Sequence, residues 1–230
     1  KRFLSWMSEN GYANSNLNLA KIAKVKSPGY KTTKTAEMML TPHEIKDLIE
    51  AATNLRDKLL ISLLYETGCR VGELGTMIWQ QIKFSEQTAT LNTDAKTGKG
   101  RLIPVVYSVT YLKDWKNNYP KGEPRPEDYL FVNLQSCEPL QYRSISKMLT
   151  IAAERGGIQK HFSPHTLRHS RITHLLRAGL SESAIKRMMW GSLSSNMLAN
   201  YAHLTDEDLE NEYCELLGII RVEREEDKSL

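Results

Sequence analysis

The sequence predicts a mainly helical α+β domain that carries one small three-stranded antiparallel sheet. Many segments place apolar residues at helical spacing, and three alternating stretches follow one another between residues 80 and 106. Hydrophobic residues at 40% and charged residues at 25% lie near the averages of soluble globular proteins, so wholesale disorder and coiled coils are excluded. No apolar run reaches the roughly 18 residues of a membrane span, and we expect no membrane partner.

Charge is unevenly distributed along the chain. The net charge is +4, yet residues 206–230 hold ten acidic and three basic residues, so the body of the chain is basic and its end is acidic. A basic body favours a polyanionic partner such as nucleic acid. The three cysteines, Cys69, Cys137 and Cys214, are far apart and fit no metal-site spacing, which indicates a reducing compartment and no zinc.

The first 40 residues are expected to precede the main domain. The chain lacks an initiator Met, and residues 3–7 already show helical spacing, so we interpret residues 1–20 as the end of an earlier domain. Residues 21–40 are interpreted as a basic linker, because Pro28 and Gly29 interrupt a stretch without acids that contains Lys21, Lys24, Lys26, Lys31 and Lys34. A solvated tether and a contact with phosphates fit this linker equally well.

Three helices are expected between residue 41 and the first strand. Thr41-Pro42-His43-Glu44 combines an N-cap, a Pro at the first helical position and a capping box, which predicts a helix to about residue 52. Residues 57–65 are apolar on nearly every side, as in a buried central helix, and Gly68 is expected to end it. A third, short helix is expected near Val71.

The rest of the main domain is predicted in the same way. Alternation predicts strands at residues 80–84, 88–92 and 101–106. Helical spacing then predicts helices at residues 109–119, 144–155, 166–178, 183–190, 196–203 and 206–217. The main domain is therefore assigned to residues 41–218, and residues 219–230 to a charged tail.

Four short motifs carry side chains that suit phosphate chemistry. In chain order they are Arg70 with Glu73 after the central helix, Lys96 with Lys99 and Arg101 in the turn before the third strand, His165 with Arg168 and His169 at a helix start, and Tyr201 ten residues after Gly191. Each motif alone has an ordinary explanation, such as a solvated turn or a packed tyrosine. His165 and Arg168, one turn apart, can face one anion, and the occurrence of all four motifs in this order is improbable by chance.

In their order and intervals the motifs resemble the catalytic domain of tyrosine recombinases, also called phage-type integrases. The resemblance covers about Thr41 to Leu217 and implies the helical catalytic domain of that family. It also implies that residues 1–20 are the remnant of a DNA-gripping, core-binding domain and that residues 21–40 are the interdomain linker.

The resemblance implies a site-specific recombinase or integrase that cleaves and rejoins DNA through a 3′-phosphotyrosyl link on Tyr201. No metal, nucleotide or other cofactor is implied. Arg70 and Arg168 would stabilise the transition-state charge, because guanidinium forks match phosphate oxygens. Lys96 would protonate the leaving 5′-oxygen, and His165 would hydrogen-bond the phosphate and assist proton transfer from the tyrosine.

Further residues receive supporting roles. Glu73 is expected to buttress Arg70 or His165, and His169 is expected to orient the site. Lys99, Arg101 and the five linker lysines are expected to contact DNA phosphates.

One position departs from the family pattern. The family usually has His or Trp directly after the Gly, whereas this chain has Ser192, whose hydroxyl can donate to phosphate but lacks their reach and bulk. Trp190 is expected to compensate in part. A tolerated natural serine and an engineered weakening are both compatible with the sequence. Two alternatives therefore stay open: a catalytically weakened DNA-binding module, and a type IB topoisomerase-like enzyme that relaxes DNA with the same chemistry.

The resemblance also implies partners. These are double-stranded DNA with attachment-type sites and a homotetramer on paired sites, with a monomer expected in the absence of DNA. Leu209, Tyr213, Leu216 and Leu217 lie at helical spacing on the acidic segment 206–217, which suits docking on a neighbouring subunit; packing on its own domain is the alternative. The expected location is a prokaryotic or viral-host cytoplasm.

Overall fold

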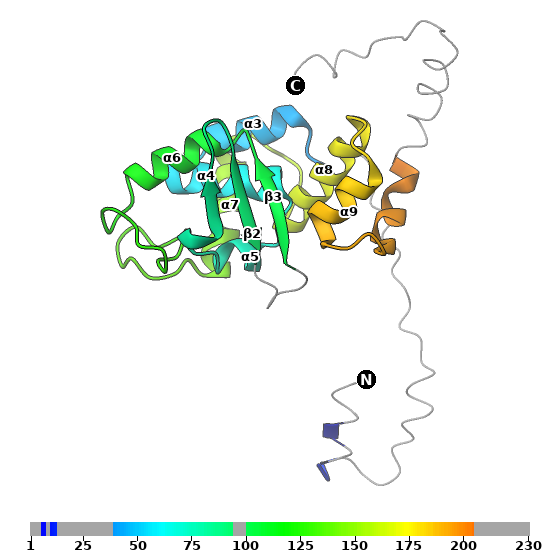
Figure 1. Ribbon diagram of the computed structural model, residues 1–230, viewed down its shortest axis with the longest axis horizontal. Helices are drawn as coiled ribbons and strands as arrows, with labels where there is room; N and C mark the ends of the chain where they lie inside the picture. The colour runs from blue at the N-terminus through cyan, green and yellow to red at the C-terminus, as the bar shows by residue number, and fades with distance from the viewer. Residues whose placement is uncertain (1–5, 8–9, 13–38, 94–99, 205–230) are drawn as a thin grey trace, which may run out of the picture. The chain divides into compact units, whose positions relative to one another are not determined.

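The computed structural model describes residues 6–7, 10–12, 39–93 and 100–204 (Figure 1). The chain divides into two compact units, residues 1–34 and 35–230, each of which is described by itself. In the first unit Trp6 and Met7 are helical, and the ring of Trp6 stacks on Tyr12 with centroids 5.5 Å apart. Most of the expected linker and all of the segments 206–217 and 219–230 lie outside the described residues.

The second unit is mainly helical and contains one three-stranded antiparallel sheet, which confirms the predicted fold class. Its α-helices are α3 (Pro42–Glu50), α4 (Leu55–Thr67), α5 (Val71–Gly75), α6 (Val109–Asn117), α7 (Tyr142–Arg155), α8 (Pro164–Arg177) and α9 (Glu182–Trp190). The described residues also form the 3₁₀ helices η2 (Trp79–Gln81) and η4 (Asn196–Leu204). No helix in the described part is long and apolar enough to cross a membrane.

The start of α3 has the expected capping box. The side chain of Thr41 accepts the backbone N–H of Glu44 at 3.2 Å, and the Glu44 carboxylate accepts the backbone N–H of Thr41 at 2.7 Å. Two orphan donors of the first turn are therefore satisfied. Glu44 also pairs with Lys160 at 2.8 Å, which joins α3 to the segment before α8.

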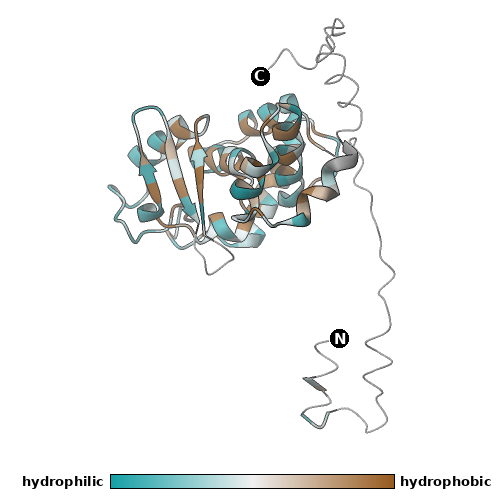
Figure 2. Cartoon of the chain, turned by 45° about the vertical axis from the view of Figure 1, so that its right-hand side comes forward, coloured by the Kyte–Doolittle hydropathy of each residue, from teal (hydrophilic) through white to brown (hydrophobic). Residues whose placement is uncertain are grey.

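Helix α4 is the centre of the unit. It is buried on nearly all sides and packs against α3, α5, α6, α8 and β3 (Arg101–Val105). Figure 2 shows that the surrounding helices carry both hydrophobic and hydrophilic residues, as elements with one buried face do. Gly68 ends α4 in the left-handed conformation, with φ at 58°.

The sheet has the order β1-β2-β3, with β1 at Ile82–Phe84 and β2 at Ala89–Thr93. Leu91 pairs with Ile82 on one side and with Ile103 on the other. β1 is shorter than the predicted strand, because residues 79–81 form a 3₁₀ turn in which the Gln81 side chain accepts the N–H of Ile78 at 2.9 Å. On β3 the buried positions are Arg101, Ile103 and Val105.

A second apolar cluster joins α8, α9 and η4. Its buried members are Met39, Ile172, Ile185, Met189, Leu198 and Tyr201. The segment expected as a helix at residues 196–203 is a 3₁₀ helix rather than an α-helix. Leu198 and Tyr201, three residues apart, are both buried, and a repeat of three residues per turn places such a pair on one face. This geometry sets Tyr201 against α8 and α9.

Candidate active site

Arg70 is placed by the sharp break between α4 and α5. Gly68 allows the left-handed turn, and a Cβ there would lie 2.6 Å from the Met189 sulfur, so the position suits glycine on two grounds. Arg70 is the N-cap residue of α5, and Glu73 accepts its backbone N–H at 2.6 Å and its guanidinium at 3.1 Å. The side chain of Arg70 remains 45% exposed, so it can reach a ligand.

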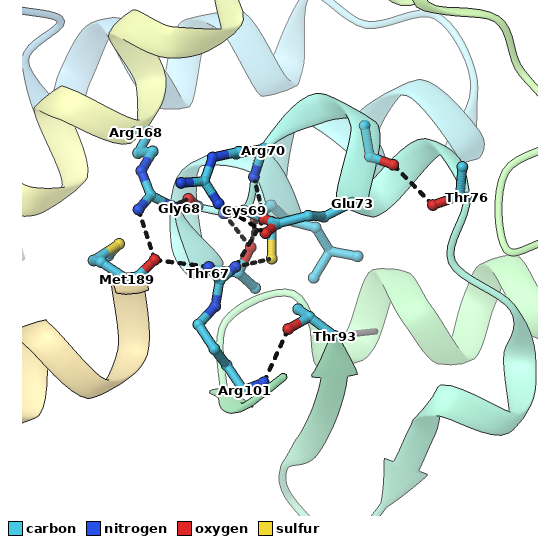
Figure 3. Close-up of polar contacts among 12 residues, drawn as sticks. Thr67, Gly68, Cys69, Arg70, Glu73, Thr76, Thr93, Arg101, Arg168 and Met189 are labelled. Carbon is cyan, nitrogen blue, oxygen red and sulfur yellow. Dashed lines mark hydrogen bonds and ion pairs between the residues drawn. The ribbon is translucent and has the colours of Figure 1, made fainter. Parts of the chain in front are cut away.

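Glu73 is the carboxylate on which two arginines converge. Its side chain is 4% exposed, and besides Arg70 it accepts Nη2 of Arg101 at 2.8 Å (Figure 3). Burial alone would raise the pKa of Glu73, but the backbone N–H of Arg70 and the guanidinium of Arg101 lower it below its ordinary value. Glu73 is therefore ionised at neutral pH and contacts both the backbone and the side chain of Arg70.

Arg168 is buried on the first turns of α8. It donates to the carbonyl oxygen of Gly68 and, through Nη2, to that of Met189 at 2.6 Å. The ring of Trp190 lies 5.4 Å from its guanidinium carbon, in cation–π geometry. Burial, followed by the nearby charges of Arg101 and Arg70, lowers the pKa of Arg168 to about 10, so the group stays charged at pH 7.

A pocket of about 230 Å³ opens between the N-terminal ends of α5, α7 and α8. It is lined by Cys69, Arg70, Val71, Gly72, Tyr142, Ser163, Pro164, His165 and Arg168. Arg70 and Arg168 line this pocket, and Arg101 shares the Glu73 carboxylate with Arg70, so three guanidinium groups and one carboxylate give the cluster an excess of positive charge. Such an arrangement binds an anion, and the arginine forks match the oxygens of a phosphate group.

The two histidines of α8 differ in their relation to Tyr201. His165 is exposed at the edge of the pocket, with its ring centroid 6.1 Å from that of His169. The hydroxyl of Tyr201 shares a hydrogen bond with Nδ1 of His169. Tyr201 is 5% exposed, and this burial raises its pKa to about 12, although the charge of Arg168 acts in the opposite direction. The sequence-based interpretation linked His165 to the tyrosine proton, whereas the contact in the structure is made by His169.

Ser192 and Trp190 have different neighbours in the structure. Ser192 is partly buried just after α9, and its hydroxyl lies 2.9 Å from that of Ser194. Trp190, the last residue of α9, contacts Arg168 through its ring. Trp190 is therefore in contact with a site cation, and its compensating role stays a prediction.

Arg101 requires a correction. We expected it on the surface as a DNA contact, but its side chain is 1% exposed and two of its three nitrogens donate to protein acceptors. The signal was present in the sequence, because on β3 Arg101 has the same parity as the buried Ile103 and Val105. Two parts of the site were missed: the Met189 carbonyl, which accepts from two arginines, and Tyr142, which lines the pocket. The sequence holds no signal for either of them.

Other expected site residues lie outside the described residues. These are Lys96 and Lys99 of the hairpin turn and the linker residues Lys21, Lys24, Lys26, Lys31 and Lys34. Within the described ranges no group of three or more His, Cys, Asp or Glu residues could hold a metal ion.

Comparison with known proteins identifies one family. The model described as "Phage integrase family" matches residues 38–208. Transposase A from transposon Tn554 of Staphylococcus aureus is 29% identical over 224 residues; the match covers 93% of this chain and 58% of the transposase, so the chain spans little more than half of that relative. Tyrosine recombinase XerA of Pyrococcus horikoshii is 29% identical over 230 residues, covering 90% of this chain and 76% of the relative.

Solved structures agree with this result. The crystal structure of XerA recombinase superposes with a TM-score of 0.65 at 27% identity, over 83% of this chain and 66% of that protein. The Tn1549 transposon integrase in complex with circular intermediate DNA has a TM-score of 0.61 at 19% identity, over 92% of this chain and 74% of the integrase, which is a likeness of fold.

Proposed function

The chain belongs to the phage integrase family of tyrosine recombinases, and from this premise we propose that it cleaves and rejoins DNA strands at specific sites through a 3′-phosphotyrosyl intermediate. The observation that carries the proposal is the contact of Arg70 and Arg101 with Glu73 beside a pocket that Arg70 and Arg168 line, with the hydroxyl of Tyr201 hydrogen-bonded to His169 on the same helix as Arg168. A fixed excess of guanidinium groups suits a phosphodiester whose transition state gains negative charge.

In the proposed reaction the phenolic oxygen of Tyr201 attacks the scissile phosphorus. A bond forms between that oxygen and phosphorus, the bond from phosphorus to the 5′-oxygen breaks, and the 3′-phosphate stays on the enzyme. The reverse reaction with the 5′-hydroxyl of another strand restores a phosphodiester and frees the tyrosine. Because the bond energy is kept in the phosphotyrosyl link, the reaction as proposed uses neither ATP nor a metal ion.

Each proton in this reaction has a proposed donor or acceptor. The proton of Tyr201 passes to Nδ1 of His169, which the hydrogen bond between them supports. Lys96 supplies the proton to the leaving 5′-oxygen, as the resemblance implies. Burial raises the pKa of Tyr201 to about 12, so the free phenolate is rare and an adjacent acceptor is needed at neutral pH.

Arg70 and Arg168 are proposed to bind the non-bridging oxygens of the phosphate. Arg70 is partly exposed and Arg168 is buried, and both line the pocket, so the phosphate would lie against both cations. His165 at the pocket edge is proposed to donate a further hydrogen bond to the phosphate.

DNA binding and assembly extend the proposal. Lys99 and the five linker lysines are proposed to contact phosphates, residues 1–20 to be the remnant of a core-binding domain, and the active form to be a tetramer on paired sites. The fold is shared with an integrase whose structure contains DNA, which supports DNA as the partner. The free thiols of Cys69 and Cys137 support a cytoplasmic location.

The test is covalent capture on DNA. The chain is incubated with a pool of duplexes that carry a randomised segment and a nick, so that the cleaved fragment diffuses away and the adduct accumulates. We expect a covalent adduct on denaturing gels, enriched for one sequence, with none from Tyr201→Phe although this variant binds the enriched duplex with similar affinity. An adduct that persists in Tyr201→Phe would reject this nucleophile, adducts without sequence preference would indicate a topoisomerase-like enzyme, and no adduct at all would indicate a DNA-binding module.

A further inference from the structure

Arg101 connects three parts of the candidate site from inside the protein. It is the first residue of β3, and its backbone N–H donates to the side chain of Thr93 at the end of β2 at 3.0 Å. Its Nη2 donates to Glu73 on α5 at 2.8 Å, and its Nη1 donates to the carbonyl of Met189 on α9 at 2.7 Å (Figure 3). One planar group therefore links the sheet to two helices.

Both acceptors of Arg101 also hold an arginine of the proposed reaction. Glu73 accepts the backbone and the guanidinium of Arg70, and the Met189 carbonyl accepts Nη2 of Arg168. The Met189 carbonyl lies in the last turn of α9, where carbonyl groups lack partners within the helix and the helix dipole is negative. Two guanidinium groups share this single oxygen.

Fold stability does not account for an arginine at this position. The neighbouring inward positions of β3 hold Ile103 and Val105, and a buried ion pair is commonly no more stabilising than apolar residues of similar volume. Nε of Arg101 is buried without a hydrogen-bond partner among the described residues, which carries a further desolvation cost. The group also adds a positive charge beside Arg168, which is unfavourable until an anion binds.

We propose that Arg101 is a positioning residue that holds Arg70 and Arg168 at a fixed separation, through Glu73 and the Met189 carbonyl, so that both meet the same phosphate. This role rests on the proposed function. In this role Arg101 does not contact the substrate. A rigid fork can span two acceptors at once, whereas a lysine ammonium at the same position can satisfy one acceptor but not reproduce the planar spacing.

The experiment compares Arg101→Lys and Arg101→Met with the wild type in single-turnover cleavage of the duplex enriched by covalent capture. Two versions of that duplex are used: the natural phosphodiester, and one in which the scissile linkage is a neutral methylphosphonate. Arg171→Met is the matched control, because Arg171 also donates to a buried carbonyl, that of Glu66 at 3.1 Å, but does not line the pocket. Thermal unfolding and DNA affinity are measured for every variant.

We expect both Arg101 variants to bind DNA within about threefold of wild type and to cleave the phosphodiester on the order of 10- to 100-fold more slowly, since small misplacements of a catalytic group have effects of this size. On the methylphosphonate, which has less charge for the arginines to neutralise, the difference from wild type should shrink to about threefold. For each variant, the loss of rate on the phosphodiester is compared with the loss of rate on the methylphosphonate. A larger loss on the phosphodiester identifies a positioning role, because general destabilisation would slow the cleavage of both substrates alike.

Three outcomes would overturn the proposal. Wild-type cleavage of the phosphodiester by both Arg101 variants would show that the site does not depend on this residue. Equal slowing on the two substrates, or failure of both variants to fold while Arg171→Met folds, would show that Arg101 serves the fold alone. If the wild-type chain forms no adduct, the proposed function itself is rejected, which is a distinguishable result.

Discussion

At the residue scale, the ring of Trp190 lies over the guanidinium of Arg168, and the last turn of α9 that carries this ring also supplies the Met189 carbonyl. Ser192, at the position where the family pattern has a large side chain, is instead near Ser194. We infer that the ring of Trp190, one residue before Gly191, supports the buried arginine. This inference predicts that replacing Trp190 slows cleavage more than replacing Ser192.

We predict that Trp190→Ala slows covalent cleavage by about 3- to 30-fold, because a partly buried cation–π contact contributes roughly 0.5–2 kcal/mol and its loss also frees the arginine side chain. Ser192→Ala should change the rate by less than about threefold. Trp190→Phe keeps an aromatic face and should recover part of the loss. The measurement is the single-turnover rate on the captured duplex, and a larger effect from Ser192→Ala than from Trp190→Ala would contradict the inference.

Sequence reasoning at this scale found the types of side chain but not all of their contacts. Arg70, Glu73, His165 and Arg168 were predicted as site residues, and the structure brings them around one pocket or its buttress. The contact between His169 and Tyr201 could not be predicted, because it depends on how η4 packs on α8, which is a long-range property. The burial of Arg101 was predictable in principle from strand parity, but a positive charge near a turn suggested the surface.

At the element scale, the break between α4 and α5 is the feature that brings Arg70 and Arg168 together. Gly68 has a positive φ, its carbonyl accepts from Arg168, and its α-carbon faces the side chain of Met189. The stop at this glycine was predicted from sequence, as was the capping box of α3, because both are local signals. The close approach of α9 to Gly68 was not predicted, because no residue near position 68 in the sequence indicates it.

We predict that Gly68→Ala lowers both stability and cleavage. The left-handed backbone costs an alanine about 1 kcal/mol, and the new methyl group would meet the Met189 sulfur at 2.6 Å. Gly179→Ala is the matched control, because Gly179 has a φ of 76° but nothing within 4 Å of its Cβ position. Gly68→Ala should unfold several degrees below Gly179→Ala, at roughly 2–4 °C per kcal/mol for a chain of this size. Thermal unfolding and single-turnover cleavage are the measurements.

The double variant Gly68→Ala with Met189→Ala separates the two causes. Removing the long Met189 side chain leaves room for the new methyl group but keeps the backbone strain and the carbonyl that Arg168 uses. We expect the double variant to recover part of the cleavage rate of Gly68→Ala. Equal melting temperatures for Gly68→Ala and Gly179→Ala would mean that the contact with Met189 is easily relieved and does not constrain the site.

At the scale of the whole molecule, the described part of the second unit holds a pocket lined by Arg70, His165 and Arg168 and, on the same helix α8, the contact of His169 with Tyr201, whereas the proposed strand exchange joins two duplexes and would need more than one such site. The mainly helical fold with its small sheet was predictable because its helices and strands have strong periodic patterns. Assembly was not predictable in the same way. The proposed assembly rests on the acidic segment 206–217, whose partner the sequence does not name.

We predict that truncation after Thr205 leaves a chain that folds and binds the captured duplex but no longer assembles on paired sites. The removed segment carries Leu209, Tyr213, Leu216 and Leu217 at helical spacing among acidic residues, so it suits an apolar pocket with a basic rim on a neighbouring subunit. Truncation after Gly218 is the control, because it keeps this segment and removes residues 219–230 alone. Mass photometry on two-site DNA should show tetramers for the full chain and for the control, and smaller complexes for the shorter chain. A single short helix offers too little surface for a stable complex by itself, so all three chains should be monomeric without DNA. Tetramers formed by the chain that ends at Thr205 would show that subunits meet through other surfaces and that segment 206–217 packs on its own domain.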